Sequence, residues 1–427
     1  MNVMKTIKKS YISAIVLSTL LCCTTSCKKN MFNEEVYNEI LKIEFPIDPV
    51  DDQQDWELTT RRSASINVPT ALKDAQRLMV LSDNPATNQA AVIMAETNRI
   101  TAGSNVLVFA APKAQTTFYA ALEQADGSLY IKAFTATNLR PSMADATQIA
   151  KPANTLGYQT FTYCFEEDYP EPGDYDFNDC VLRISVAPGQ QSNQRKITVT
   201  LAATGASKLI GAAINILNYN YDDIESVVEL DGVMWDEGYP AHRWLMDNTA
   251  TLQKGRNGEA VIRLFENASW IMVRNDADNA GGLINYKVNV SRTASDDTKQ
   301  TDPTTKTFIV TFKESATTLL NNFTLLNLDP FVVTVYNSGT WETHTYPYKH
   351  LNVLFEGVQQ NSSNMTWALC IPSGDFRWPL EGVLIGSAKD GLITGAYREP
   401  NHAFGSWAAN KSRAQDWYLH PTTTSVY

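Results

Sequence analysis

Short apolar runs separated by polar turn residues follow one another after residue 65. Each run has the length of a strand, and neighbouring runs start roughly 10–13 residues apart. Turn segments such as Ser82–Pro85 and Asp126–Ser128 lie between them. This pattern predicts a small antiparallel β domain over residues 66–150. The five runs are Leu78–Leu81, Ala91–Met94, Asn105–Ala110, Thr117–Leu122 and Leu129–Phe134.

From Thr160 onward, apolar and polar residues alternate with a period of two, first around Phe161 and again around Leu182. This period predicts strands with one buried face, so the chain is expected to be mainly β. The predicted architecture is an antiparallel β-sandwich or jelly-roll-like domain over residues 160–420. Within this domain, helix is predicted only at Glu314–Leu320 and Phe404–Trp417, and an exposed loop at Ser295–Thr307. Further strands are predicted at Lys196–Ala202, Ala212–Leu217, Ser226–Leu230, Ala260–Leu264, Trp270–Val273, Asn285–Val290, Thr307–Phe312 and Phe331–Tyr336.

The N-terminus has the pattern of an export signal. Three lysines precede an apolar run over Tyr11–Cys23, which is short for a membrane span. Small polar residues and then Cys27 follow, an arrangement similar to a bacterial lipobox. We therefore expect residues 1–26 to be a lipoprotein signal peptide and Cys27 to be acylated, with palmitate among its chains. Residues 27–65 are polar and proline-containing and are predicted to be a tether, with one short helix over Glu34–Lys42.

The charge of the chain argues against nucleic acid as a partner. Its 427 residues include 35 Lys and Arg against 46 Asp and Glu, a net charge of −11. Loss of residues 1–26 removes three lysines and no acid, which brings the charge to −14. An acidic protein without a basic stripe repels a phosphate backbone. Hydrophobic residues make up 44%, enough for a sizeable core, so disorder is not expected.

The segment Glu166–Asp179 concentrates negative charge between two predicted strands. Seven carboxylates and one asparagine fall within its 14 residues. Asp174, Asp176 and Asn178 stand at alternate positions and Asp179 follows directly. Oxygen ligands at such spacing suit Ca²⁺, which takes six to eight oxygens at about 2.3–2.6 Å. The ordinary alternative is a solvated acidic turn, but the apolar Phe177 among the acids favours a packed loop.

Calcium is therefore the predicted cofactor, in a structural role. The sequence is not an EF-hand, because Asp179 and Ser185 stand where that loop needs Gly and Glu. Zinc and copper are not expected here, because no histidine lies near the cluster. The predicted ligands are Asp174, Asp176, Asn178, Asp179, Glu166 and Glu167.

The same segment resembles the signature of the LruC-domain lipoproteins of Gram-negative envelopes, with Gly173–Asp179 at its centre. Glu167 departs from the family's usual Asp, and Tyr169 stands where Trp is common. The resemblance covers about residues 160–420, and it implies a β-rich envelope domain whose acidic loop binds calcium. Matching C-terminal blocks are Trp367–Leu369, Pro372, Trp378–Gly382, Ala396–Tyr397, Phe404, Trp407–Ala408 and Asp416–Tyr418.

Catalytic motifs of the familiar hydrolases and nucleotide enzymes are missing from the sequence. A pair of carboxylates could still hydrolyse glycosides. Candidate acids are Glu166, Glu381 and Glu237, with Asp236 as nucleophile. Tryptophans crowd the last 61 residues, where they would be sugar-stacking platforms if exposed and core if buried, and burial is the favoured alternative.

Three cysteines besides Cys27 remain after signal cleavage, which is no disulfide scaffold. Cys164 and Cys180 flank the acidic loop, but alternation puts them on opposite faces, so a disulfide between them is not favoured. Asp276 and Asp278 are a second, weaker candidate for a metal site.

We therefore expect an outer-membrane lipoprotein that has a calcium-stabilised binding module and no catalysis. Its expected partners are the membrane, through Cys27, and a protein or glycan ligand. The alternative is a glycan-binding or glycan-hydrolysing surface lipoprotein. The sequence leaves both the surface-exposed and the periplasmic face open, since Lys28 and Lys29 precede the first acids after Cys27.

Overall fold

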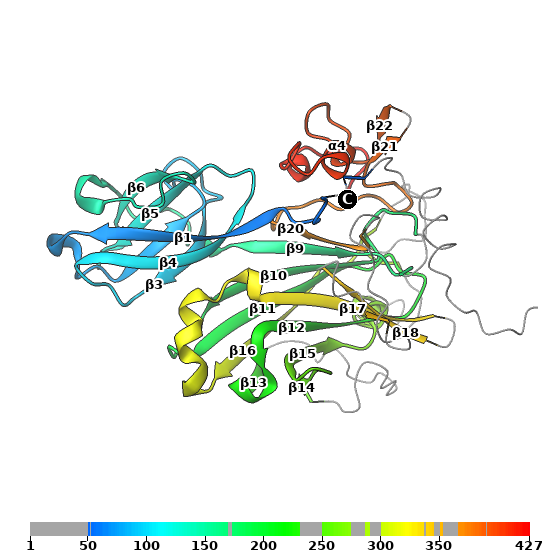
Figure 1. Cartoon of the computed structure of the whole chain (residues 1–427), viewed down its shortest axis with the longest axis horizontal. Coiled ribbons are helices and arrows are strands. Elements are labelled where there is room, and N and C mark those ends of the chain that lie inside the picture. The colour runs from blue at the N-terminus through cyan, green and yellow to red at the C-terminus, as the bar shows by residue number, and fades with distance from the viewer. Residues whose placement is uncertain are drawn as a thin grey trace, which may run out of the picture. The chain divides into compact units, whose positions relative to one another are not determined.

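The computed structural model describes residues 50, 51, 53–169, 173–230, 250–274, 287–290, 300–336, 339–345, 351, 352, 366–389 and 391–427. They form mostly antiparallel sheets with few helices (Figure 1), which confirms the mainly β fold class. The chain divides into the units Met1–Ile43 and Glu44–Tyr427, and every described residue belongs to the second. The predicted signal peptide, Cys27 and the helix over Glu34–Lys42 lie outside the described residues.

The first β domain has a six-stranded sheet in the order β7-β6-β5-β2-β3-β8, with a separate pair, β1 and β4, packed on one face. Ile66 of β1 and Phe109 of β4 share a buried core with Leu78 and Phe118 of the large sheet. All five strands predicted for this domain are present. The strands are β1 (Thr59–Val68), β2 (Arg77–Leu81), β3 (Val92–Thr97), β4 (Gly103–Pro112), β5 (Thr117–Glu123), β6 (Leu129–Thr135), β7 (Thr147–Ile149) and β8 (Gly157–Tyr158).

The predicted tether is wrong over its described C-terminal part. Residues 59–65 belong to β1, which pairs along its whole length with β4. Just before it, Trp56 and Leu58 are only 2% and 1% exposed. The alternation of this segment is interrupted by charged residues, and its strand partners lie 41–53 residues further along the chain. Burial here depends on partners that are distant in sequence, so the local composition does not report it.

Two six-stranded sheets form the β-sandwich of the second domain, in the orders β13-β16-β11-β10-β9-β20 and β14-β15-β12-β17-β18-β19. Phe161 and Leu182 from one sheet and Ile214 and Val332 from the other lie in one buried core. The strands are β9 (Thr160–Phe165), β10 (Cys180–Pro188), β11 (Gln194–Ala203), β12 (Ile210–Asn220), β13 (Ile224–Leu230), β14 (Leu252–Lys254), β15 (Glu259–Phe265), β16 (Thr304–Phe312), β17 (Leu328–Tyr336), β18 (Gly339–His344), β19 (Leu351–Asn352) and β20 (Ala368–Ile371).

One predicted strand of this domain is a helix. Residues Ala268–Arg274 form α3, where a strand over Trp270–Val273 is predicted. The Asn267 side chain accepts a hydrogen bond from the Trp270 backbone N–H at 3.2 Å and so caps the helix N-terminus. The buried Ala268, Ile271 and Met272 then follow helical spacing. The strand prediction thus overlooked Asn267, the N-cap signal just before the apolar run.

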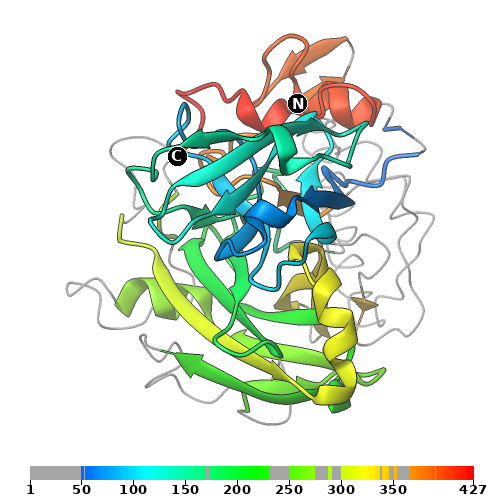
Figure 2. The ribbon, with the colours of Figure 1, turned by 90° about the vertical axis from the view of Figure 1, so that its left-hand side faces the viewer.

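Three other segments refine the predictions. In the segment Asn285–Val290, the described part makes one isolated bridge, Thr204–Val288, instead of a strand. The helix predicted at Glu314–Leu320 is present as a 3-10 helix, η5 (Glu314–Asn322), which is yellow in Figures 1 and 2. The helix predicted at Phe404–Trp417 is shorter: α4 (Phe404–Ala409) ends before a turn.

The C-terminal segment packs an aromatic cluster with the residues just before β1. Trp407 and Trp417 have ring centroids 5.8 Å apart, and Trp56 meets Trp407 edge-on at 5.6 Å. The Gln54 amide donates to the Trp407 carbonyl at 2.8 Å. Burial of such large rings anchors both chain segments. The remaining elements are β21 (Ser387–Lys389), β22 (Leu392–Thr394), η1 (Thr70–Leu72), η2 (Met143–Asp145), η3 (Tyr221–Asp223), η6 (Leu325–Asn327) and η8 (Trp417–Leu419).

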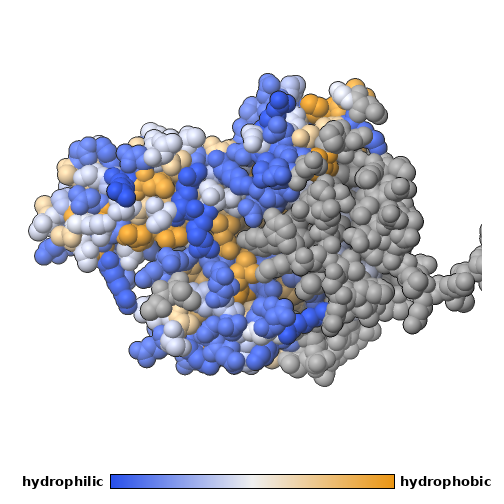
Figure 3. All heavy atoms as spheres, viewed as in Figure 1, coloured by the Kyte–Doolittle hydropathy of each residue, from blue (hydrophilic) through white to orange (hydrophobic). Residues whose placement is uncertain are grey.

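The surface drawn in Figure 3 is mostly hydrophilic, and its hydrophobic residues form small separate areas. Scattered exposed apolar side chains are common on the surfaces of folded proteins. Among the described residues, no helix has the length and apolarity needed to cross a bilayer. The exposed large hydrophobic residues are Val106, Val228, Leu230, Leu392, Ile393 and Leu419.

Candidate metal centre

The acidic loop connects two central strands of the sandwich. β9 ends at Phe165 and β10 begins at Cys180, and these two residues are paired across the strands. Both are fully buried. The loop therefore starts and ends at neighbouring fixed points of the core. Its residues 170–172 lie outside the described part of the chain.

Two bulky residues of this loop, Tyr175 and Phe177, have left-handed backbones, with φ of 55° and 53°. This conformation costs about 1–3 kcal/mol and persists only where the surroundings fix it. Both side chains are buried, at 2% and 0% exposure. The Tyr175 carbonyl accepts a hydrogen bond from the Ile385 N–H at 2.9 Å, and the Phe177 N–H donates to Glu166 Oε1 at 2.5 Å. The buried rings and these bonds hold the loop in one shape.

Three of the predicted ligands meet in this shape. Glu166, Asp174 and Asp176 each bring one carboxylate oxygen within 4.8 Å of the others. Glu166 and Asp176 are buried, at 0% and 1% exposure, whereas Asp174 is exposed. The cluster is thus buried at its base and open to solvent at Asp174. Such convergent carboxylate oxygens are the ligands that hard cations prefer.

One oxygen of the cluster lacks a donor. Glu166 Oε2 is buried, and no described group donates a hydrogen bond to it. A Cβ atom at Gly173 would lie 2.5 Å from this oxygen, so only glycine leaves room for it there. A buried anionic oxygen without a donor is costly unless a cation meets it.

Electrostatics points in the same direction. Burial is the main cause that raises the pKa values of Glu166 and Asp176 well above their usual range, and repulsion between the carboxylates of the cluster adds to it. Burial also raises the pKa of Asp174, and the nearby Glu381 raises it further. Burial and mutual repulsion thus oppose the ionised carboxylates, and a bound proton or an added cation would offset their charge. A divalent cation reverses the local preference and favours the ionised carboxylates.

A distant segment completes the surroundings of the cluster. The Gly382 N–H donates to Asp176 Oδ2 at 2.7 Å, and the neighbouring Glu381 forms an ion pair with Lys287. Lys287 lies close enough to lower the pKa of Asp174 in part. Gly382 and Lys287 carry no signal in the sequence that would mark them as site residues. Only the fold brings them to the loop.

Glu167 and Asp179 brace the loop instead of joining the cluster. Glu167 accepts hydrogen bonds from the backbone N–H groups of Ser207 and Lys208 at 3.0 and 2.5 Å. Asp179 Oδ2 accepts from the Glu167 N–H at 2.8 Å. These carboxylates therefore tie the loop to the β11–β12 connection.

Asn178 also braces the loop. Its Nδ2 donates to the Pro379 carbonyl at 3.3 Å, while its Oδ1 lies against Gly205, where a Cβ atom would be only 2.0 Å away. The six predicted ligands thus divide into a convergent set, Glu166 with Asp174 and Asp176, and three braces. Spacing along the chain does not separate the two sets.

The remaining candidates are distributed as follows. Asp236, Glu237, Asp276 and Asp278 lie outside the described residues. The four C-terminal tryptophans are buried, so they are core and not sugar-stacking platforms; they are Trp367, Trp378, Trp407 and Trp417.

The cysteines flanking the loop are not bonded to each other. Cys164 is paired with Val181, the residue after Cys180, so the two thiols point to opposite faces of the sheet. Both are free and buried, and burial raises their pKa values. The opposite faces predicted from the alternation are confirmed.

Comparison with known families gives one match. The model of a domain of unknown function, DUF4842, matches residues 193–418, more than half of the chain. The chain belongs to the DUF4842 family. The match begins after the acidic loop but includes Gly382 and the C-terminal segment. The resemblance to LruC-domain lipoproteins stays a prediction.

Two solved structures show weak similarity to this DUF4842 protein. One is described as a "Putative lipoprotein from Bacteroides ovatus", with 15% identity and a TM-score of 0.49, over 83% of this chain and 99% of that one. The other is the major pilin SpaD from Corynebacterium diphtheriae, with 10% identity and a TM-score of 0.14, over 81% and 92%. No curated protein matches the chain.

Proposed function

We propose that this chain is an outer-membrane lipoprotein, anchored through Cys27, whose β-sandwich is a calcium-stabilised binding module without catalytic activity. The anchor is supported by the signal-like N-terminus and the small residues before Cys27. Two or three acyl chains would hold the protein on a membrane stably. The expected ligand is an envelope protein or a glycan.

The convergence of Glu166, Asp174 and Asp176 around a buried oxygen that has no donor among the described residues carries the calcium proposal. These three side chains would hold the ion, and water would complete its shell on the exposed Asp174 side. Calcium would supply positive charge next to these carboxylates, whose pKa values are raised, and so favour their ionised form. No histidine or cysteine is among the three ligands, so a hard cation fits better than zinc.

Calcium at this point would be structural. Asp176 is bound to the Gly382 N–H and Tyr175 to the Ile385 N–H, so the loop is joined to the C-terminal segment on both sides. An ion that fixes Asp176 would therefore fix this connection as well. Binding to the folded state alone raises stability in proportion to the logarithm of calcium concentration.

Calorimetric titration of the purified full chain with calcium tests this proposal. We expect one ion to bind and the affinity to fall at least about tenfold in Asp174→Asn, because an amide replaces an exposed carboxylate ligand. The matched control is Asp145→Asn, which removes another exposed charge far along the chain from the loop, where Asp145 pairs only with Lys132 among the described residues. Equal affinities in both variants, or no calcium binding, would refute the site.

Anchoring and partner have separate tests. Metabolic labelling with a palmitate analogue should mark the wild type and not Cys27→Ala, and protease treatment of whole cells should show which face of the outer membrane carries the protein. A glycan array combined with hydrolysis assays distinguishes the binding module from a glycosidase. Turnover that is lost on Glu166→Gln would overturn the non-catalytic role.

A further inference from the structure

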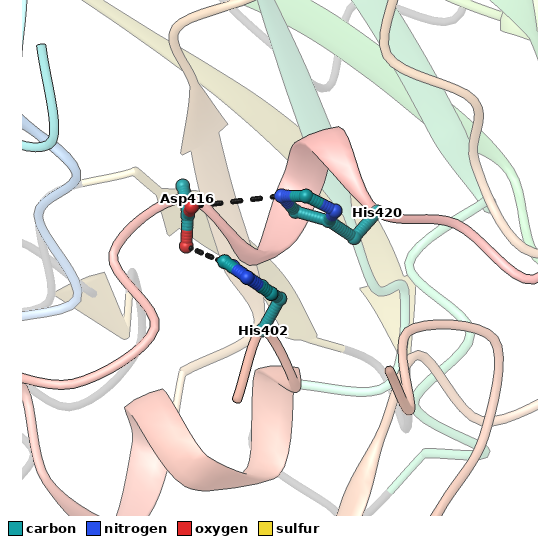
Figure 4. Close-up of side chains that lie close together, drawn as sticks. All are labelled: His402, Asp416 and His420. Carbon is teal, nitrogen blue, oxygen red and sulfur yellow. Dashed lines mark hydrogen bonds and ion pairs between the residues drawn. The ribbon is translucent and has the colours of Figure 1, made fainter. Parts of the chain in front are cut away.

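His402 and His420, 18 residues apart in sequence, meet at one carboxylate near the C-terminus. His402 Nδ1 lies 2.9 Å from Asp416 Oδ1, and His420 Nε2 lies 3.5 Å from Asp416 Oδ2 (Figure 4). The imidazole rings are stacked, with centroids 3.9 Å apart. One ligand atom from each residue lies within 4.8 Å of the other two. In the sequence these histidines are simply scattered.

The backbone around each of the three residues is held by the aromatic core. Ala403 and Phe404 directly after His402 are fully buried, and so is Trp417 directly after Asp416. The His420 N–H donates to the Trp417 carbonyl at 3.0 Å within the turn that also carries Asp416. Ligands on backbone fixed by neighbouring packing are preorganised, which favours metal affinity.

We propose that His402, Asp416 and His420 form a binding site for Zn²⁺ or a similar borderline transition-metal ion. Neutral imidazole nitrogen and carboxylate oxygen are ordinary zinc ligands. Two ligand atoms across a tetrahedral zinc with bonds of about 2.0–2.1 Å lie about 3.3 Å apart. The observed N–O separations of 2.9 and 3.5 Å lie on either side of that distance.

The site is partly open. The side chains of His402, Asp416 and His420 are 36%, 30% and 36% exposed. Three protein ligands leave at least one coordination position for water or for a group from a binding partner.

This site differs in chemistry from the acidic loop. The loop offers carboxylate oxygens and suits a hard cation, whereas the C-terminal cluster offers two nitrogens. The two sites share no residue. Zinc binding to His402 and His420 is therefore expected to persist in the Asp176→Asn variant, which makes the two proposals independent in experiment.

Calorimetric titration of the full chain with zinc, after dialysis against a chelator, tests the site. We expect one zinc ion to bind in both wild type and Asp176→Asn. Affinity should fall at least about tenfold in His402→Ala, His420→Ala and Asp416→Asn, because losing even an outer-shell partner of a metal ligand typically costs that much. The matched control is Glu399→Gln, which removes an exposed negative charge three residues before His402 and should leave the affinity unchanged.

Cobalt provides a second readout that does not depend on affinity. Co²⁺ in the proposed site should give visible absorption typical of nitrogen and oxygen ligands, and the spectrum should change in His402→Ala. Circular dichroism establishes that each variant is folded. The proposal is overturned if folded His402→Ala and His420→Ala bind zinc like the wild type, or if the wild type does not bind it, since the three side chains are then only a hydrogen-bonded cluster.

Discussion

Glu166 and Glu167 are neighbours in sequence, and substituting each by glutamine should have opposite consequences. Glu166→Gln keeps the Oε1 acceptor for the Phe177 N–H. It replaces Oε2, the oxygen that has no described donor, with the NH2 group of the side-chain amide. Without calcium, this removes a buried unsatisfied oxygen, which is worth about 1–3 kcal/mol. In chelator, Glu166→Gln should therefore unfold at a higher temperature than the wild type.

Calcium should reverse this order. At a concentration 100 times the dissociation constant, a bound ion adds about 2.7 kcal/mol to the stability of the wild type. For a domain of this size that is a rise of about 5–10 °C in melting temperature. Glu166→Gln has lost a ligand and should gain much less. The melting temperatures of the two proteins should thus cross between chelator and millimolar calcium.

The pH dependence of stability tests the same assignment of Glu166 in a second way. The folded-state pKa of Glu166 is raised above its unfolded value of 4.5, chiefly by burial. A carboxyl with a raised pKa destabilises the fold above that pKa, and the effect disappears as the pH falls toward 4.5. Without calcium, acidification from neutral pH should therefore stabilise the wild type more than Glu166→Gln.

Glu167→Gln is the matched control in the same thermal melts. It removes a charged acceptor from the N–H groups of Ser207 and Lys208, a loss of about 1.5–3 kcal/mol. Its melting temperature should fall by a similar amount with and without calcium. If Glu166→Gln behaves like Glu167→Gln, with a drop in both conditions, the assignment of Glu166 to the metal centre is wrong.

Three further predictions concern the surrounding fold. Gly205→Ala places a methyl group 2.0 Å from Asn178 Oδ1 and should lower the free energy of unfolding, measured by denaturant titration, by about 1–3 kcal/mol. Gly157→Ala, with nothing within 4 Å of the added methyl group, should not lower it. Burial lowers the pKa of His344, but its carboxylate neighbours raise it to about 9. The charged His344 therefore stabilises the fold by about 3 kcal/mol below pH 6.5, and this contribution is lost as the pH rises through 9. His344→Gln should remove this pH dependence from the free energy of unfolding. The buried Cys164 should resist alkylation until the protein unfolds, as mass spectrometry would show.

Most of the fold follows from local patterns. The alternation around Phe161 and Leu182 places these residues in the sandwich core, because a strand presents successive side chains to opposite faces. The same alternation separates Cys164 from Cys180. Where the predictions are wrong, the reasons differ: β1 is a strand because the distant β4 pairs with it, whereas α3 begins at Asn267, a local cap next to an apolar run.

The sequence by itself determined that an acidic loop would lie between two core strands, because both the strand period and the charge are local properties. Only the tertiary structure decided which acids converge: Glu166 has an oxygen without a described donor, while Glu167 is occupied by Ser207 and Lys208. Tertiary structure also brings His402 to Asp416 and His420, which are neighbours within one turn. A site depends on distances between segments that pack against each other, and spacing along the chain does not record those distances.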